Sequence, residues 1–583
     1  MELLTREASR EEFDDAQMTI HDIKSDLVKS RVPFFDYQTY VFNQLFPNQD
    51  INKHTLLHEP MVLDENRQRV QEAMVMFDKL MTDKLFLKSL VQTLENQKGL
   101  SMQDKAHFAC TLSVAFLGNM KLFYELVSSL LIDMIQSSHK KQHNVLFKRF
   151  DSITQRLMVN WLELSLYEHL KKQSGMQLFM LYKATQAVIE KGPIDAVTNH
   201  CRNTLAADRL LKNRVECETL TLRIDLNGNS DNHIPVTVLD CDTITQVKQK
   251  CITAIYKNKP ASEIPTVNEL ELEWHRGRSG KLVLQDIDKI SERCNGMVRL
   301  NTLKHYIVKN GSKMSLVYKT AFENEVDELY GNQRIANDQN TSPRKVLIPE
   351  CLEEHLSNLT DEEKSQDHEI GELFLNRLFH TKLILRDYID AAFKGIMNSQ
   401  SLSVPVRYFL CMIDKQAKAV GADNDAVQAW KSECYATRVW ASLISRPQIL
   451  FDVVVPSHVE PCMDILKQVF IDSFTQEPQN VSNESSTQKL LFFKDVLEYR
   501  KHVDSFFLRV ESVSDSEFLR AIDEISSVQS RDIKFNRLAT LHQLYNIVAK
   551  YKDEIVEGFS ESNETNDFDF DTRLEEVSEK MDK

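Results

Sequence analysis

Two arginines in apolar surroundings are the residues of this chain whose types and positions could do chemistry. Arg149 lies between Phe147 and Phe150, just ahead of a predicted helix, and Arg438 lies within another apolar segment. A guanidinium is always charged and can donate two parallel hydrogen bonds, so a loop that presents one outward is suited to binding phosphate. Two alternatives stay open: a solvated surface position for Arg149, and for Arg438 a structural role in which the stem packs and the head group bonds carbonyls.

The helix that would position Arg149 is predicted from its cap and from its apolar spacing. Asp151 or Ser152 can accept a hydrogen bond from an unpaired amide of the first turn. Apolar residues then recur every three to four positions, as a buried helix face requires. They are Ile153, Leu157, Met158, Trp161, Leu162 and Leu164. A comparable face accompanies Arg438 and consists of Val439, Trp440, Leu443 and Ile444.

The length and composition of the chain limit the classes of protein to which it can belong. A chain of 583 residues with 42% hydrophobic and 27% charged residues predicts a soluble globular protein of two to four domains. A net charge of −15 gives no support to general nucleic-acid binding. The ten cysteines form no CxxC pair, which disfavours zinc ribbons and thioredoxin-like sites, and free thiols suit a reducing cytosol. The amino-terminal residues do not have the pattern of a signal peptide, and no apolar run is long enough to span a bilayer.

The residue pattern changes twice along the chain, and this predicts an inserted domain. Helical periodicity precedes residue 216, period-two alternation with a single helix fills about a hundred residues after it, and helical periodicity then returns. We therefore expect a compact ββαβ-type sheet within one helical body. The predicted segments are 11–50 (a lead-in with an acidic amphipathic helix at 11–32), 51–215 (first helical half), 216–320 (inserted domain), 321–368 (linker), 369–560 (second helical half) and 561–583 (an acidic tail with at most a frayed helix).

Two weaker motifs are interpreted structurally. "HRGRSGK" resembles the end of a phosphate-binding loop, but His275 occupies the position of the first glycine, so a turn between strands is favoured. We expect Trp274, just before it, to be a core or strand aromatic. His139 and His143 lie four residues apart without a visible third ligand, which predicts surface residues rather than a metal site.

Several longer motifs resemble one known family. "RFDSITQR" (149–156) resembles the R-x-x-S-φ-x-x-K finger segment of Ras GTPase-activating proteins. "TRVWASLISRP" resembles their second signature, with Arg438 followed nine residues later by Pro447. The resemblance is most specific to the cytoplasmic region of plexins, the semaphorin receptors. It covers nearly the whole chain, with the motifs in the same order. The segments that carry it are "RVPFFDYQTY", "TLENQKGLSMQDKA", "EKGPIDAVT", "LDCDTITQVKQK", "LEWHRGR", "RLNTLKHY" and "KLLFFKDVLEYRKHV".

The resemblance implies a fold and an activity. The fold would be mainly α: a helical GTPase-activating domain formed by two sequence halves, with an inserted ubiquitin-like α/β domain that binds Rho-family GTPases. Such a protein activates a Ras/Rap-family GTPase by supplying arginines, rather than being an enzyme with its own complete active site, and needs no cofactor or metal. Arg149 fills the finger position and Arg438 the second arginine position. Candidate contacts with the GTPase are Lys148, Asn160, Ser442 and Lys494.

Two departures from the family pattern keep an alternative open. Lys148 replaces an arginine, so that it keeps the charge but loses the bidentate fork. Ser442 stands where the family often has asparagine, and its reach is shorter. The alternative is a catalytically weak or inactive signalling scaffold that binds small GTPases.

The resemblance also implies partners and a location. The partners would be a GTP-bound Ras/Rap-family GTPase, a Rac/Rnd-like Rho-family GTPase and a second copy of the chain. Semaphorin would be bound only through an ectodomain that this sequence does not contain. A receptor of this kind, associated with axon guidance, would place the chain on the cytoplasmic side of the cell membrane, whereas the chain alone would be soluble and cytosolic.

Overall fold

The computed structural model describes most of the chain. The described residues are 19–25, 31–58, 67–97, 99–138, 143, 145–148, 151–212, 215–228, 233–277, 280–294, 297–319, 345–346, 364–475, 486–532, 534–561 and 569–582. Arg149 and most of the predicted linker lie outside these residues. Of the helix predicted at 11–32, the structure describes residues 19–25 as helical and 31–32 as outside any helix.

The first part of the chain forms a series of helices whose starts are set by side-chain caps. Asp83, Ser101, Asn119 and Ser152 each accept a hydrogen bond from a backbone amide of the first turn that follows. The helices are α2 (Tyr37–Leu45), α3 (Arg67–Leu80), α4 (Lys84–Asn96), α5 (Met102–Ala115), α6 (Met120–Ser137), α7 (Ile153–His169) and α8 (Gly175–Lys191). A π-helical turn at Leu170–Ser174 joins the last two.

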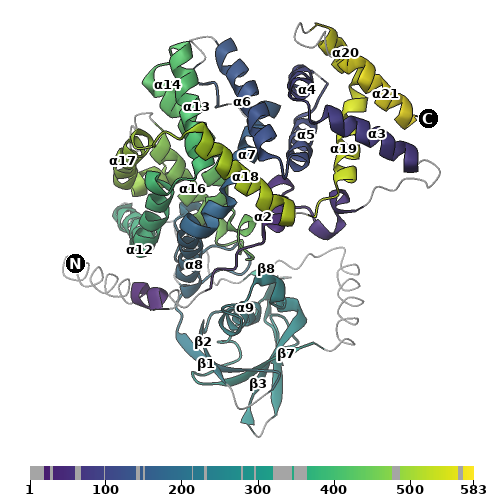
Figure 1. Ribbon diagram of the computed structural model, residues 1–583. Helices are drawn as coiled ribbons and strands as arrows, with labels where there is room; N and C mark the ends of the chain where they lie inside the picture. Colours follow the sequence, from purple (N-terminus) through teal and green to yellow (C-terminus); the bar gives the residue numbers. More distant parts are fainter. Residues whose placement is uncertain are drawn as a thin grey trace.

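The last part of the chain adds helices to the same body (Figure 1). They are α12 (Lys364–Ile396), α13 (Val404–Val420), α14 (Asn424–Lys431), the π-helix η11 (Ser432–Trp440), α15 (Ala441–Ser445), α16 (Glu460–Phe474), α17 (Thr487–Leu508), α18 (Asp515–Asp532), α19 (Arg537–Lys550), α20 (Lys552–Glu561) and α21 (Phe570–Asp582). A single hydrophobic core contains buried residues of both parts, so the prediction of one helical body made from two halves is confirmed.

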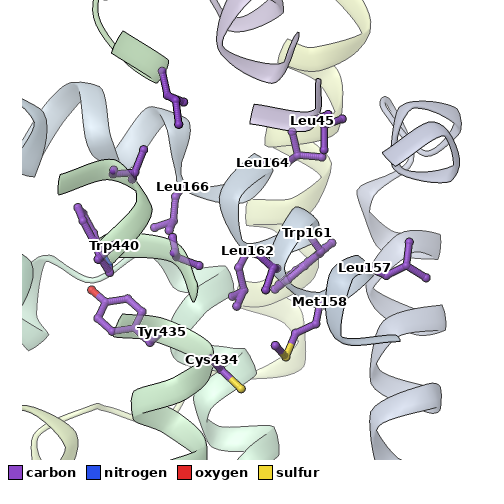
Figure 2. Close-up of a cluster of buried hydrophobic side chains, with 14 of the residues drawn as sticks. Leu45, Leu157, Met158, Trp161, Leu162, Leu164, Leu166, Cys434, Tyr435 and Trp440 are labelled. Carbon is purple, nitrogen blue, oxygen red and sulfur yellow. The ribbon is translucent and has the colours of Figure 1, made fainter. Parts of the chain in front are cut away.

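The packing of α7 against η11 joins the two halves. Figure 2 shows Trp161 and Leu162 of α7 in the same buried cluster as Tyr435 and Trp440 of η11. The tryptophans at 161 and 440 are fully buried. Burying one large side chain of this kind contributes about 1.5–3 kcal/mol, so this seam stabilises both halves together.

The inserted domain is a five-stranded mixed sheet with one helix packed on it. The strand order is β2-β1-β7-β3-β4, with β1 and β7 parallel and the other neighbours antiparallel. The elements are β1 (Thr219–Leu226), β2 (Ile234–Leu239), α9 (Ile244–Ile255), β3 (Leu270–His275), β4 (Lys281–Leu284) and β7 (Lys313–Tyr318). Leu220, Leu222 and Ile224 alternate into a core that belongs to this domain alone. The predicted turn after Trp274 joins the antiparallel strands β3 and β4, and Trp274 packs on the core from β3.

Hydrogen bonds attach the inserted domain to the helical body below α8 (Figure 1). The Oγ atom of Ser262 donates to Oδ2 of Asp452 at 2.6 Å, and the amide of Ala261 donates to the Asp452 carbonyl at 3.1 Å. Nε2 of Gln246, in α9, donates to the carbonyl of Ile194 at 2.9 Å. Between these attachments lies a cleft of about 1200 Å³, lined by residues of α8, β2, α9 and α12.

Two predictions about segments of the chain differ from the structure, namely the extent of the linker and the nature of the acidic tail. α12 begins at Lys364, within the predicted linker, and Lys345–Val346 form a short strand, β8, beside β6 (Met297–Arg299). The acidic carboxyl-terminal segment is not merely a frayed tail, because α21 buries three apolar side chains at helical spacing and packs on α3. Those side chains are Phe570, Leu574 and Val577. Among the described helices, none combines the length and apolar character needed to cross a membrane.

Candidate functional site

The loop before α7 is fastened to the second half of the chain. The indole Nε1 of Trp430, in α14, donates to the carbonyl of His143 at 2.6 Å. The ring of Phe147 lies against the same indole, with 5.8 Å between ring centroids. The prediction that His143 is a surface residue is therefore wrong, because it is 5% exposed and packs its imidazole against Trp430. This packing fixes the described part of the loop up to Lys148.

Arg438 reaches the same loop from η11. Its Nη2 atom donates to the carbonyl of Lys148 at 2.9 Å and to that of Phe147 at 3.4 Å. Lys148 is the residue directly before Arg149 in the sequence, so the second arginine holds the backbone that leads to the first. Hydrogen bonds from a charged donor are the stronger kind, typically about 1.5–3 kcal/mol net.

The π-helical winding of η11 brings a carboxylate to Arg438. Glu433 and Arg438 are five residues apart, and their side chains form an ion pair of 3.7 Å. In an α-helix that separation would place them about 140° apart around the axis. The i→i+5 hydrogen bonds of a π-helix place them one turn apart instead, as the bond from the Ala441 amide to the Ala436 carbonyl illustrates.

The electrostatics of this pair follow from its partial burial. Burial raises the pKa of Glu433, whereas the positive charges of Arg438 and Lys148 act to lower it. Both members of the pair keep 23% of the side chain exposed, so solvent screens the interaction. The carboxylate therefore orients Arg438 without removing its charge from the surface.

The start of α7 is capped twice. Ser152 accepts from the amide of Gln155 at 3.0 Å, so of the two predicted caps Ser152 is the one that forms. The carboxylate of Glu95, in α4, accepts from the amides of Ile153 and Thr154 at 3.2 and 3.3 Å. A negative charge at a helix amino terminus is stabilising. Both ends of the segment around Arg149 are thus held by the rest of the fold.

The other predicted site residues differ in how far the structure exposes them to solvent. Lys148 is exposed on the loop, and Lys494 is exposed on α17. Ser442 is half-buried in α15, and its Oγ accepts a hydrogen bond from Nη2 of Arg446. Asn160 points into the core, where its Nδ2 donates to Oγ of Ser113 at 2.9 Å. Because this buried amide bonds a buried hydroxyl, it stabilises α7 against α5.

Sequence reasoning missed three residues that position this site. Glu95, Trp430 and Glu433 hold the start of α7, the loop and Arg438, respectively. The pairing of Trp430 with His143 spans 287 positions, and no local pattern signals it. No group of three or more His, Cys, Asp and Glu that could hold a metal ion occurs among the residues that the structure describes.

Together these features define a class of protein: a helical domain built from two separated halves around an inserted α/β domain, with an arginine of one half held against a loop of the other. A family model described as the plexin cytoplasmic RasGAP domain matches residues 31–555. The chain belongs to this family of plexin cytoplasmic domains.

Individual relatives show the same similarity over nearly the full chain. Human Plexin-A2 is 31% identical over 94% of this chain and 30% of its own length, and zebrafish Plexin A3 is equally similar. Human Plexin-B1 is 29% identical over 99% of this chain and 28% of its own length. The chain thus spans about 30% of the length of these relatives. The crystal structure of the ubiquitin like domain of PLXNC1 aligns over all of its own length and 18% of this chain, with 31% identity and a TM-score of 0.16.

Proposed function

We propose that this chain activates a Ras/Rap-family GTPase by inserting Arg149 into the nucleotide site of the GTP-bound partner. The observation that supports the proposal is the hydrogen bond of 2.9 Å from Arg438 to the carbonyl of Lys148, the residue directly before Arg149 in the sequence. The membership in the plexin cytoplasmic RasGAP domain family supports the same activity.

The proposed mechanism is electrostatic. GTP hydrolysis develops negative charge around the transferred phosphoryl group and the bridging oxygen, and the guanidinium of Arg149 neutralises it. A finger of this kind is worth roughly 10³–10⁵ in rate. Arg438 is a positioning residue, because it acts on the backbone of the finger loop. The partner orients the attacking water, so the chain needs no general base of its own.

Three residues near or beyond the loop would contact the GTPase. Lys148 adjoins the finger and is exposed, so its ammonium can pair with an acidic group or a phosphate of the partner. Ser442 and Lys494 remain proposed contacts, and Ser442 would have to exchange its bond from Arg446 for one to the partner.

The remaining parts of the proposal concern regulation. The inserted domain would bind a Rac/Rnd-like Rho-family GTPase, and a second copy of the chain would form an activating dimer. The chain would act on the cytoplasmic side of the cell membrane as the signalling part of a plexin-type receptor in axon guidance, with semaphorin bound by an ectodomain. The inserted domain has its own core and two described attachments to the helical body, through Asp452 and Ile194, so a partner bound to it can act on that body.

The test is single-turnover GTP hydrolysis by a Rap-type GTPase, with the chain dimerised through a fused coiled coil. Arg149→Ala should lower the stimulated rate by about 10³-fold or more. Arg299→Ala, which removes an exposed arginine of the inserted domain that pairs with Glu292, is the control and should change nothing. Equal rates for wild type and Arg149→Ala across Ras and Rap substrates would refute the role of Arg149 as an arginine finger. The alternative, a scaffold that binds small GTPases without activating them, would then remain, and it is the alternative that Lys148 and Ser442 favour.

A further inference from the structure

Two free thiols face each other where the chain passes from the helical body into the inserted domain. Thr219 pairs with Leu239 across β1 and β2, and the amide of Asp240 donates to the Glu218 carbonyl at 2.9 Å. The ladder ends there and the chain turns after β2, so Cys217 and Cys241 are the next residues beyond this bonded pair, and their thiols hydrogen bond to each other.

The surroundings make Cys217 the nucleophile of the pair. The hydrogen bond from Cys241 and the charge of Arg202 lower the pKa of the Cys217 thiol, against the opposing effects of burial, Asp240 and Asp242. The same hydrogen bond and burial raise the pKa of Cys241. A half-exposed thiol with a lowered pKa, beside a second thiol, has the features of a reactive cysteine with a resolving partner.

We propose that Cys217 and Cys241 are a redox modification site that forms a reversible disulfide on reaction with hydroperoxides. The Cys217 thiolate attacks a peroxide oxygen, so that an S–O bond forms, the O–O bond breaks and the leaving oxygen departs as water after taking a proton. The Cys241 thiol then attacks the sulfenic sulfur, the S–S bond forms, and the hydroxyl leaves with a proton as a second water. Two thiols are oxidised and one hydrogen peroxide is reduced; glutathione or a dithiol reverses the step.

Other described cysteines lack this combination. Cys201, Cys251 and Cys434 are buried, and burial raises the pKa of each thiol. Cys217, by contrast, also lines the large cleft between the inserted domain and the helical body, which gives a small oxidant a path to it. The disulfide would link the start of β1 to the turn that leads into α9, at the junction of the two bodies. In reducing cytosol such bonds are transient and act in sensing, which fits a site that is reduced at rest.

The experiment oxidises the full reduced chain with near-stoichiometric hydrogen peroxide at neutral pH, alkylates the remaining thiols and maps the cysteine peptides by mass spectrometry. The linked Cys217–Cys241 peptide should accumulate roughly tenfold faster than the half-exposed Cys411 thiol is lost. Cys241→Ser should stop the reaction at a sulfenic acid on Cys217 that dimedone traps, and Cys217→Ser should leave Cys241 reduced. Cys411→Ser is the matched control and should form the linked peptide at the wild-type rate.

Replacing Arg202 tests whether Cys217 is chemically activated or is merely close to Cys241. Arg202→Gln should slow formation of the linked peptide several-fold at neutral pH and recover the wild-type rate at alkaline pH, which a purely structural role would not produce. Oxidation of Cys411 ahead of Cys217, or a Cys217 product that is only intermolecular, would overturn the proposal.

Discussion

Arg438 donates a hydrogen bond of 2.9 Å to the backbone carbonyl of Lys148, a residue 290 positions earlier in the chain. The second half of the helical body therefore holds the loop of the first half at the residue before Arg149. Its ion-pair partner Glu433 and the indole of Trp430 come from the same continuous helical segment. The inserted domain separates the two halves in sequence without separating them in space.

Removing the Arg438 side chain should slow stimulated hydrolysis less than removing Arg149. A hydrogen bond from a charged donor is worth about 1.5–3 kcal/mol, so Arg438→Ala should lower kcat about 10–100-fold and leave KM for the GTPase nearly unchanged. Arg438→Lys should recover part of kcat, since a charged ammonium can still donate to the loop carbonyls but lacks the rigid planar group that aims Nη2 at them. Steady-state kinetics with a Rap-type GTPase measure this, with Arg299→Ala as control. A change in KM alone would instead make Arg438 a binding contact.

Glu433 should act through Arg438 and in a pH-dependent way. Glu433→Gln keeps the size of the side chain and removes a partly screened ion pair, so stimulated hydrolysis should fall only a few-fold. Because burial raises the pKa of Glu433, this carboxylate should become protonated at a higher pH than an ordinary glutamate. The wild type should therefore lose the contribution of the ion pair to the rate already on mild acidification. The rate ratio of wild type to variant, measured as pH falls, should approach one. A constant ratio would contradict the pairing as the source of the effect.

Glu163, buried in α7, should make the protein less stable as pH rises. Burial raises its pKa to about 8, although the Gln44 hydrogen bond and the Arg446 charge oppose this. Between pH of about 4.5 and about 8 the unfolded state releases the proton and the folded state retains it, so the free energy of unfolding falls with rising pH. Glu163→Gln cannot ionise and should gain stability over this window, reaching about 3–5 kcal/mol.

Denaturant unfolding at several pH values measures that difference. Glu575→Gln, at an exposed position of α21, is the matched control and should follow the wild type. A stability difference between wild type and Glu163→Gln that does not change with pH would show that Glu163 is already ionised in the folded protein.

The carboxyl-terminal helix should contribute to the stability of the helical body. Phe570 is 1% exposed, and its ring lies 5.6 Å from that of Phe86 in α4. Phe570→Ala should therefore lower the free energy of unfolding by about 3 kcal/mol. Chemical denaturation of the full chain tests this, with exposed Thr572→Ala as the control. Equal midpoints for Phe570→Ala and Thr572→Ala would mean that α21 unfolds before the body does.

The attachment of the inserted domain through Asp452 should be separable from its folding. Asp452→Ala removes the acceptor of the Ser262 hydroxyl and amide but keeps its own backbone carbonyl. The amide of Ser262 should then exchange hydrogen about tenfold faster, whereas amides of β1, in the sheet, should be unaffected. Hydrogen exchange by mass spectrometry measures both, with Asp464→Ala as an exposed control. Faster exchange of β1 would instead mean that docking stabilises the whole domain.

The sequence by itself determined the local elements and their order. The spacing of apolar residues after Ser152 predicted α7, and the cap formed where that spacing begins. The change to period-two alternation near residue 216 predicted the inserted sheet, because a strand half-buried on one face must alternate. Arg149 and Arg438 stood out because their apolar neighbours signalled ordered surroundings.

Only the tertiary structure decided which residues meet. The contact of Arg438 with Lys148, the Glu95 cap on α7 and the burial of His143 by Trp430 join residues tens to hundreds of positions apart. The acidic end of the chain is a packed helix because α3 and α4 offer it an apolar surface. Periodicity records which face of an element is buried, but the partner that buries it depends on how the elements pack together.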